Sequence, residues 1–96
     1  MELEFTGELF YWRGPAPYHF VSVPDGGCAD LKEISRSVSY GWGVIPVTVR
    51  IGETEWTTSP FPKDGGYVVP VKSWVRAAET LEDRVVVTLT VVVGRP

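Results

Sequence analysis

The sequence contains no asparagine and no glutamine, and it has one cysteine and one histidine in 96 residues. Asn and Gln are the side chains that read adenine through paired hydrogen bonds in the major groove, so one class of DNA reader is excluded. Cys28 alone cannot form an intramolecular disulfide, which agrees with a reducing compartment. Cys28 and His19 are also too few for a structural zinc site built from Cys and His ligands.

The chain also lacks an excess of basic charge and a long hydrophobic run. Its formal net charge is −3 and its isoelectric point is about 5.0, which disfavours general affinity for nucleic acid or anionic lipid. The longest apolar run, Val85 to Val93, is far shorter than the roughly 20 residues of a membrane-spanning helix. Glu2, Glu4 and Glu8 stand where a secretory signal would carry positive charge. We therefore expect a cytoplasmic protein that binds no membrane.

The composition that is present, 44% hydrophobic and 22% charged residues, indicates one globular domain over residues 1–96. Apolar and polar residues alternate in several segments, as in half-buried strands, and two segments have the spacing of amphipathic helices. The pattern predicts a mainly β, barrel-like fold with about six strands and two short helices. The predicted strands cover residues 2–13, 18–23, 44–51, 54–59, 67–71 and 85–93, and the predicted helices cover 28–38 and 72–81.

Prolines and capping residues mark the boundaries of these elements. Pro46 lacks a backbone donor, so its strand is expected at a sheet edge or at a division between two sheets. Residues 60–66 are predicted to be a loop. Pro70 suits the first position of the second helix, and Asp30 with Glu33 indicates a capping box at the start of the first helix.

Four segments, "YHFVSVP", "GWGVIPVTVRIG", "WTTSPFPKDGGYVVPVK" and "VRAAETLEDRVVVTL", together resemble a small bacterial domain family of unknown function. Members occur alone or fused to a bacteriocin-protection (YdeI/OmpD-associated) domain. The resemblance covers nearly the whole chain and implies a double-split β-barrel, or pseudobarrel, capped by two short helices and similar in fold to the AbrB, MazE and MraZ regulators. Where the family often has Gly-Asp before the last strand, this chain has residues 81–84, so that turn is expected to differ. The family transfers no catalytic residue.

The reactive side chains have mostly structural interpretations. A nucleophilic pair of Cys28 and His19 lacks a family signature, and Cys28 lies on an apolar stripe, so a buried thiol is favoured. His19 alternates with aromatic residues and is expected to be a surface or locally satisfied imidazole. Glu2, Glu4 and Glu8 could bind a cation, although such a row usually pairs with Lys or Arg across the sheet. We predict no catalytic residue, no metal site and no cofactor.

The tryptophans leave more alternatives open. Trp42, between two glycines, is either a core side chain that plugs the barrel or an exposed contact residue. Trp56 and Trp74 are expected in the core, whereas Trp12 is undecided. Phe10 and Trp12 interrupt the polar face of the first strand near its end.

Two function classes remain, and an enzyme is a distant third. The first is a non-enzymatic binding module for a small ligand or a protein. The second is a DNA-binding regulator, which rests on fold analogy alone and would use a basic patch of Lys72 and Arg76, one helical turn apart. The acidic composition favours the first. A monomer is expected because residues 18–34 and 66–78 each run strand, proline, helix, so that one chain could supply both halves of a pseudo-symmetric barrel. The candidate binding residues are Trp12, Arg13, Trp42, Arg50, Trp56 and Lys63.

Overall fold

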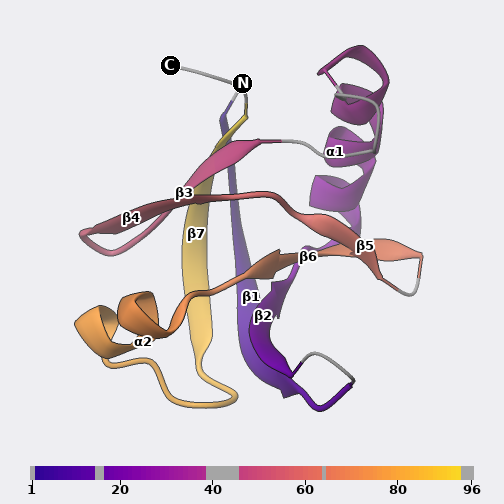
Figure 1. Cartoon of the computed structure of the whole chain (residues 1–96). Helices are drawn as coiled ribbons and strands as arrows, with labels where there is room; N and C mark the ends of the chain where they lie inside the picture. Colours follow the sequence, from indigo (N-terminus) through magenta and orange to yellow (C-terminus); the bar gives the residue numbers. More distant parts are fainter. Residues whose placement is uncertain (1, 15–16, 39–45, 64, 94–96) are drawn as a thin grey trace.

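The structure is a computed structural model that describes residues 2–14, 17–38, 46–63 and 65–93. Within these residues, seven strands form one curled antiparallel sheet in the order β4-β3-β7-β1-β2-β6-β5, and α1 and α2 lie at opposite sides of it (Figure 1). The mainly β fold expected from the sequence is confirmed. The elements are β1 (Glu2–Trp12), β2 (Tyr18–Ser22), α1 (Asp25–Val38), β3 (Val47–Ile51), β4 (Thr54–Thr58), β5 (Phe61–Lys63), β6 (Gly66–Pro70), α2 (Ser73–Glu79) and β7 (Val86–Val93).

The long strand β1 changes partners along its length. Residues 2–8 pair with β7, and residues 9–12 pair with β2. Gly7 lies at this change, where a Cβ atom would stand 2.6 Å from the backbone oxygen of Ser22 and 2.7 Å from a methyl carbon of Val21. Only glycine lets β2 approach β1 this closely, because real Cβ contacts are longer.

The chain from β4 to β5 connects the two ends of the sheet order. β4 pairs with β3 and β5 pairs with β6, with only residues 59–60 between them, and the ribbon follows one path across the molecule (Figure 1). β5 was predicted to be a loop, which is wrong: Phe61, Pro62 and Lys63 pair with β6. Pro62 is tolerated there because β5 is an edge strand that needs no second set of backbone donors.

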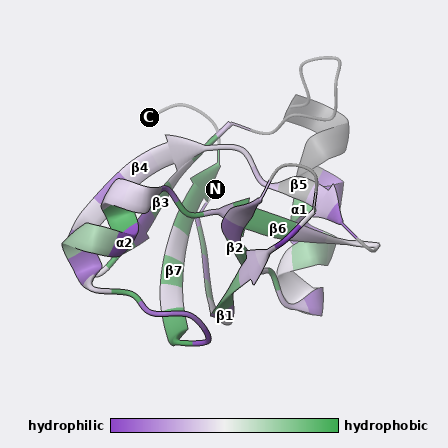
Figure 2. Cartoon of the chain, turned by 60° about the horizontal axis from the view of Figure 1, so that its bottom comes forward, coloured by the Kyte–Doolittle hydropathy of each residue, from purple (hydrophilic) through white to green (hydrophobic). Residues whose placement is uncertain are grey.

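The main core fills the concave side of the curled sheet. Along β7, buried Val87, Leu89, Val91 and Val93 alternate with more exposed residues. The strand is largely hydrophobic in Figure 2 because valines also occupy part of its exposed face. The inward face predicted for β7 is therefore confirmed, except that Val85 lies before the strand and is 36% exposed. Burial of such aliphatic side chains is the principal stabilising contribution to the fold.

Both helices differ from the predicted boundaries. α1 begins at Asp25, and the amide of Cys28 already donates to the carbonyl of Pro24, so the predicted turn is helical and the predicted capping box of Asp30 and Glu33 lies inside the helix. Asp25 in the first turn favours this earlier start because an acidic side chain interacts well with the positive end of the helix dipole.

The second helix is shorter than its apolar stripe predicts. Pro70 is in β6 rather than at the start of α2, since the amide of Val71 still donates to a carbonyl of β2. α2 ends at Thr80, whose φ of 53° is left-handed. Its seven residues bury Val75 and leave Trp74 52% exposed, so the prediction that Trp74 belongs to the core is wrong. Neither described helix has the length and hydropathy to cross a membrane.

Candidate functional site

Four aromatic side chains gather on the outer face of the sheet, opposite the main core. The β1–β2 register pairs Phe10 with Phe20 and Trp12 with Tyr18, and these positions alternate with inward-facing core residues. The ring centroid of Phe20 lies 6.0, 6.2 and 5.6 Å from those of Phe10, Trp12 and Tyr18. Phe20 is only 3% exposed although it is not part of the main core. This outer aromatic cluster is thus a second, smaller core.

Two of the predicted binding residues, Lys63 and Arg13, contact aromatic rings near the end of β1. The Nζ atom of Lys63 lies 5.5 Å from the ring centroid of Trp12, and the guanidinium carbon of Arg13 lies 5.6 Å from that of Tyr11. Both distances are in the range of cation–π attraction. Because Tyr11 and Trp12 are neighbours in one strand, their side chains point to opposite faces. The structure therefore brings Trp12 and Lys63 together and keeps Arg13 apart from them.

The other predicted binding residues lie elsewhere. Arg50 is exposed in β3, in register with Glu55 of β4 and Thr90 of β7. Trp56 is 3% exposed and packs in the main core, which confirms its core interpretation and removes it from the contact surface. Trp42 lies outside the described residues.

The predicted basic pair of α2 is only partly exposed. Lys72 is the N-cap residue, and its carbonyl accepts the amide of Arg76 at 3.1 Å. Both side chains are half-buried, and Nε of Arg76 is buried without a hydrogen-bond partner among the described residues. A phosphate-binding surface needs accessible guanidinium and ammonium groups, so this arrangement adds no support to the DNA-binding alternative.

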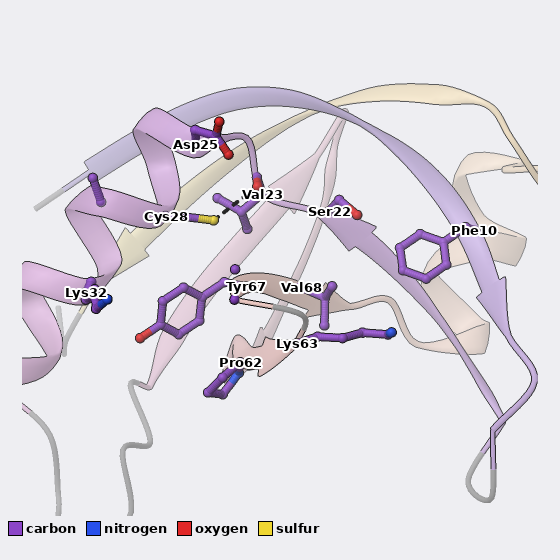
Figure 3. A pocket seen from close by; sticks show the side chains of 13 residues that line it. Phe10, Ser22, Val23, Asp25, Cys28, Lys32, Pro62, Lys63, Tyr67 and Val68 are labelled. Atoms are coloured by element: carbon purple, nitrogen blue, oxygen red, sulfur yellow. Dashed lines mark hydrogen bonds between the residues drawn. The ribbon is translucent and has the colours of Figure 1, made fainter.

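A pocket of about 900 Å³ opens between α1 and the β5–β6 hairpin (Figure 3). Three parts of the chain that are distant in sequence build it: the end of β1, the segment from β2 into α1, and the hairpin. The lining residues are Phe10, Ser22, Val23, Asp25, Cys28, Ala29, Lys32, Pro62, Lys63, Gly65, Gly66, Tyr67 and Val68.

The pocket wall between α1 and the hairpin is closely packed. The thiol of Cys28 donates to the carbonyl of Val23 at 3.2 Å, as Figure 3 shows. A Cβ atom on Gly66 would lie 3.4 Å from this sulfur, so the hairpin approaches α1 closely at that residue. Cys28 is half-buried, which agrees with the expectation of a structural thiol only in part, because one side of it faces the pocket.

The single histidine lies away from the pocket. Nε2 of His19 is 2.8 Å from Oδ1 of Asp83, and its ring packs on that of Tyr11 in a tilted arrangement with the centroids 4.8 Å apart. The expectation of a locally satisfied imidazole is confirmed. Across the described ranges, no group of three or more His, Cys, Asp or Glu side chains is arranged to hold a metal ion.

Sequence reasoning missed most of the pocket, including Tyr67 and Lys32. The sequence did not mark either residue as functional, because Tyr67 fits the pattern of a strand and Lys32 that of a helix. Phe10 did give one: it interrupts the polar face of β1, and the structure places it in both the outer aromatic cluster and the pocket wall.

The fold and the pocket define a small, mainly β domain with a concave site beside an aromatic cluster. A family model described as "Domain of unknown function (DUF1905)" matches residues 5–91, and the chain belongs to this family. No curated protein matches the chain significantly.

Proposed function

We propose that this domain is a non-enzymatic binding module whose ligand is a small organic anion held between α1 and the β5–β6 hairpin. The observation that carries the proposal is the pocket, whose volume of about 900 Å³ falls within the roughly 300–1,000 Å³ of small-molecule sites. Its wall combines apolar side chains such as Val23, Val68 and Phe10 with a few polar groups. This composition is typical of ligand sites.

The charges on the wall support an anionic ligand. Lys32 on α1 and Lys63 on β5 both line the pocket, and Asp25 is the one acidic residue among the described lining residues. The net charge of the described wall is therefore positive in a chain whose formal net charge is −3. A positive site on an otherwise negative surface concentrates anions locally.

Binding is favoured over catalysis because the thiol of Cys28 donates to the carbonyl of Val23 and, among the hydrogen bonds of the described residues, is not joined to a basic side chain. Cys28 and Ser22 line the pocket, but the only histidine of the chain is paired with Asp83 elsewhere. Activation of a thiol or hydroxyl ordinarily requires an adjacent base.

Titration of the ¹⁵N-labelled chain with small organic acids, benzoate and hexanoate among them, tests the proposal. We expect shifts of the amides of Ser22, Cys28 and Tyr67, with dissociation constants of about 1 mM for ligands of this size. A Lys32→Met, Lys63→Met double variant should weaken binding, whereas the distant Arg50→Met should not. Saturable shifts that lie outside the pocket, or none at all, would contradict the proposal.

We also propose that the curled sheet is a double-split barrel of the kind the resemblance implies. Two features support this: β1 divides its pairing between β7 and β2, and the β4–β5 path divides its pairing between β3 and β6. The single cysteine, which allows no intramolecular disulfide, supports action in a reducing compartment such as the cytoplasm. By the same resemblance, the domain would occur alone or fused to a bacteriocin-protection domain. A monomer mass of 10.6 kDa in light scattering, against a dimer mass, tests whether one chain suffices.

A further inference from the structure

The two walls of the pocket differ in charge. On the α1 wall, Asp25 and Lys32 have opposite charges. On the hairpin wall, Lys63 is the only charged side chain among the described lining residues. Lys63 lies on the side of the pocket away from α1 (Figure 3). The lysine of the hairpin wall is therefore the one placed beside the end of β1, where Trp12 lies.

The ammonium group of Lys63 is held in place by an aromatic ring. Its Nζ atom lies 5.5 Å from the ring centroid of Trp12, and Trp12 in turn packs on Phe20, which is buried. A cation that rests on a packed ring loses less rotamer entropy when it binds an anion than a lysine extended into solvent. The outer aromatic cluster thus supports the charged group of the pocket.

Phe10 supplies an aromatic surface on the same side. It lines the pocket beside Lys63 (Figure 3), and it is only half-buried. Its ring centroid lies 6.0 Å from that of Phe20, at an interplanar angle of 38°, and this contact with a buried ring restricts the orientation of Phe10. The surface of Phe10 that faces the pocket is therefore a preformed place for a planar ring.

We propose that the pocket takes an aromatic organic acid, with its ring packed against Phe10 and its anionic group paired with the ammonium of Lys63. This inference rests on the proposed function and adds the ligand class and the orientation of the ligand. Phe10 and Lys63 together favour a molecule that carries an aromatic ring close to an anionic group. An aliphatic acid can form the charge pair with Lys63 but not the ring contact with Phe10.

Three probes separate these contributions on the full chain. Naphthalene-2-sulfonate has a planar ring and an anion, 2-naphthol has a similar ring and is neutral near pH 7, and hexane-1-sulfonate has the anion without the ring. We expect naphthalene-2-sulfonate to bind about tenfold more tightly than either of the others, as measured by amide shifts of Ser22 and Tyr67. Intermolecular NOEs should connect naphthalene protons with ring protons of Phe10.

Variants assign the two contacts. Lys63→Met should reduce naphthalene-2-sulfonate affinity to about that of 2-naphthol, whereas Lys32→Met, the matched lysine on the other wall, should change it by less than about threefold. Phe10→Leu should lower the affinity of the two naphthalene probes and leave that of hexane-1-sulfonate unchanged. If Phe10→Leu does not fold, the NOEs of the unmodified chain report the same contact.

Two results would overturn the inference and leave the proposed function intact. These are equal binding of hexane-1-sulfonate and naphthalene-2-sulfonate, or loss of affinity with Lys32→Met but not with Lys63→Met. Equal binding of 2-naphthol and naphthalene-2-sulfonate would contradict both the inference and the anionic ligand of the proposed function. Failure of all three probes and of benzoate and hexanoate to shift pocket amides would instead reject the proposed function itself.

Discussion

The indole Nε1 of Trp56 in β4 donates a hydrogen bond to the carbonyl oxygen of Pro70 in β6 over 3.1 Å. β4 ends the sheet order on one side, and β6 is next to the last strand on the other. Among the described residues no backbone ladder joins β4 to β6, so this side chain adds a direct link between the two ends of the sheet. This hydrogen bond closes the curl around the main core.

Trp56→Phe should destabilise the fold because it removes this donor while retaining an aromatic ring. Pro70 would lose its partner and the smaller ring would leave space, so we expect a loss of about 1–3 kcal/mol in the free energy of unfolding. Urea denaturation followed by circular dichroism measures the change. Trp74→Phe on the exposed face of α2 is the matched control and should stay within about 0.5 kcal/mol. Equal effects of the two changes would refute the role of the hydrogen bond.

Gly7→Ala should be among the more damaging small changes in β1. The added methyl group would meet the backbone of Ser22, and backbone cannot move aside without disturbing the pairing of β2, so a cost of about 1–3 kcal/mol is expected. Gly26→Ala in α1 is the control, since a Cβ atom there has no neighbour within 4 Å. It should be neutral or stabilising by up to about 1 kcal/mol. A neutral Gly7→Ala would show that β2 can shift.

The outer aromatic cluster should contribute to stability and not only to the surface. Phe20→Ala is expected to cost about 3–5 kcal/mol, because it removes a buried ring. Tyr18→Ala, at the 37% exposed member of the cluster, should cost much less. Thermal unfolding of both variants at one protein concentration makes the comparison. A cost for Phe20→Ala below that of Tyr18→Ala would mean that the cluster is not a packed core.

Tight binding to duplex DNA is not expected at physiological salt. The net charge is −3, and the predicted basic pair of Lys72 and Arg76 is half-buried, so few phosphates can be neutralised. Fluorescence anisotropy with random and palindromic duplexes should give no submicromolar affinity. A submicromolar, strongly salt-dependent affinity would restore the DNA-binding regulator as the leading alternative.

Alternation of residues predicted the strands best where one face is buried and the other is open. β7 and β3 follow this pattern, and their inward residues are buried as expected. β2 does not, because Phe20 and Val21 are adjacent and both buried, one on each face of the sheet. An alternating pattern of apolar and polar residues predicts a strand with one buried face, so it does not identify a strand that is buried on both faces. β5 was missed for a different reason: Pro62 and the nearby glycines favour a loop, and only pairing with β6 makes a strand.

The pocket could not be predicted from local patterns, because its walls come from β1, α1 and the β5–β6 hairpin. Trp12 and Lys63 were both named as candidates, yet nothing in their spacing of 51 positions indicated that they meet. The break in the polar face at Phe10 and Trp12 did point to the C-terminal end of β1, which is the end that contributes to the pocket. Tertiary pairing of β1 with β2, and of β2 with β6, then decided which distant residues join them.

Because β1 runs as one continuous strand from its pairing with β7 to its pairing with β2, we expect its length to be constrained during evolution. Insertion of a single residue before Leu9 would turn Leu9 outward and Phe10 inward, and would reverse every later side chain of the strand at once. Deletions would have the same effect. Homologues should therefore vary in length in the connection between Trp12 and Tyr18, and conserve the number of residues from Phe5 to Trp12.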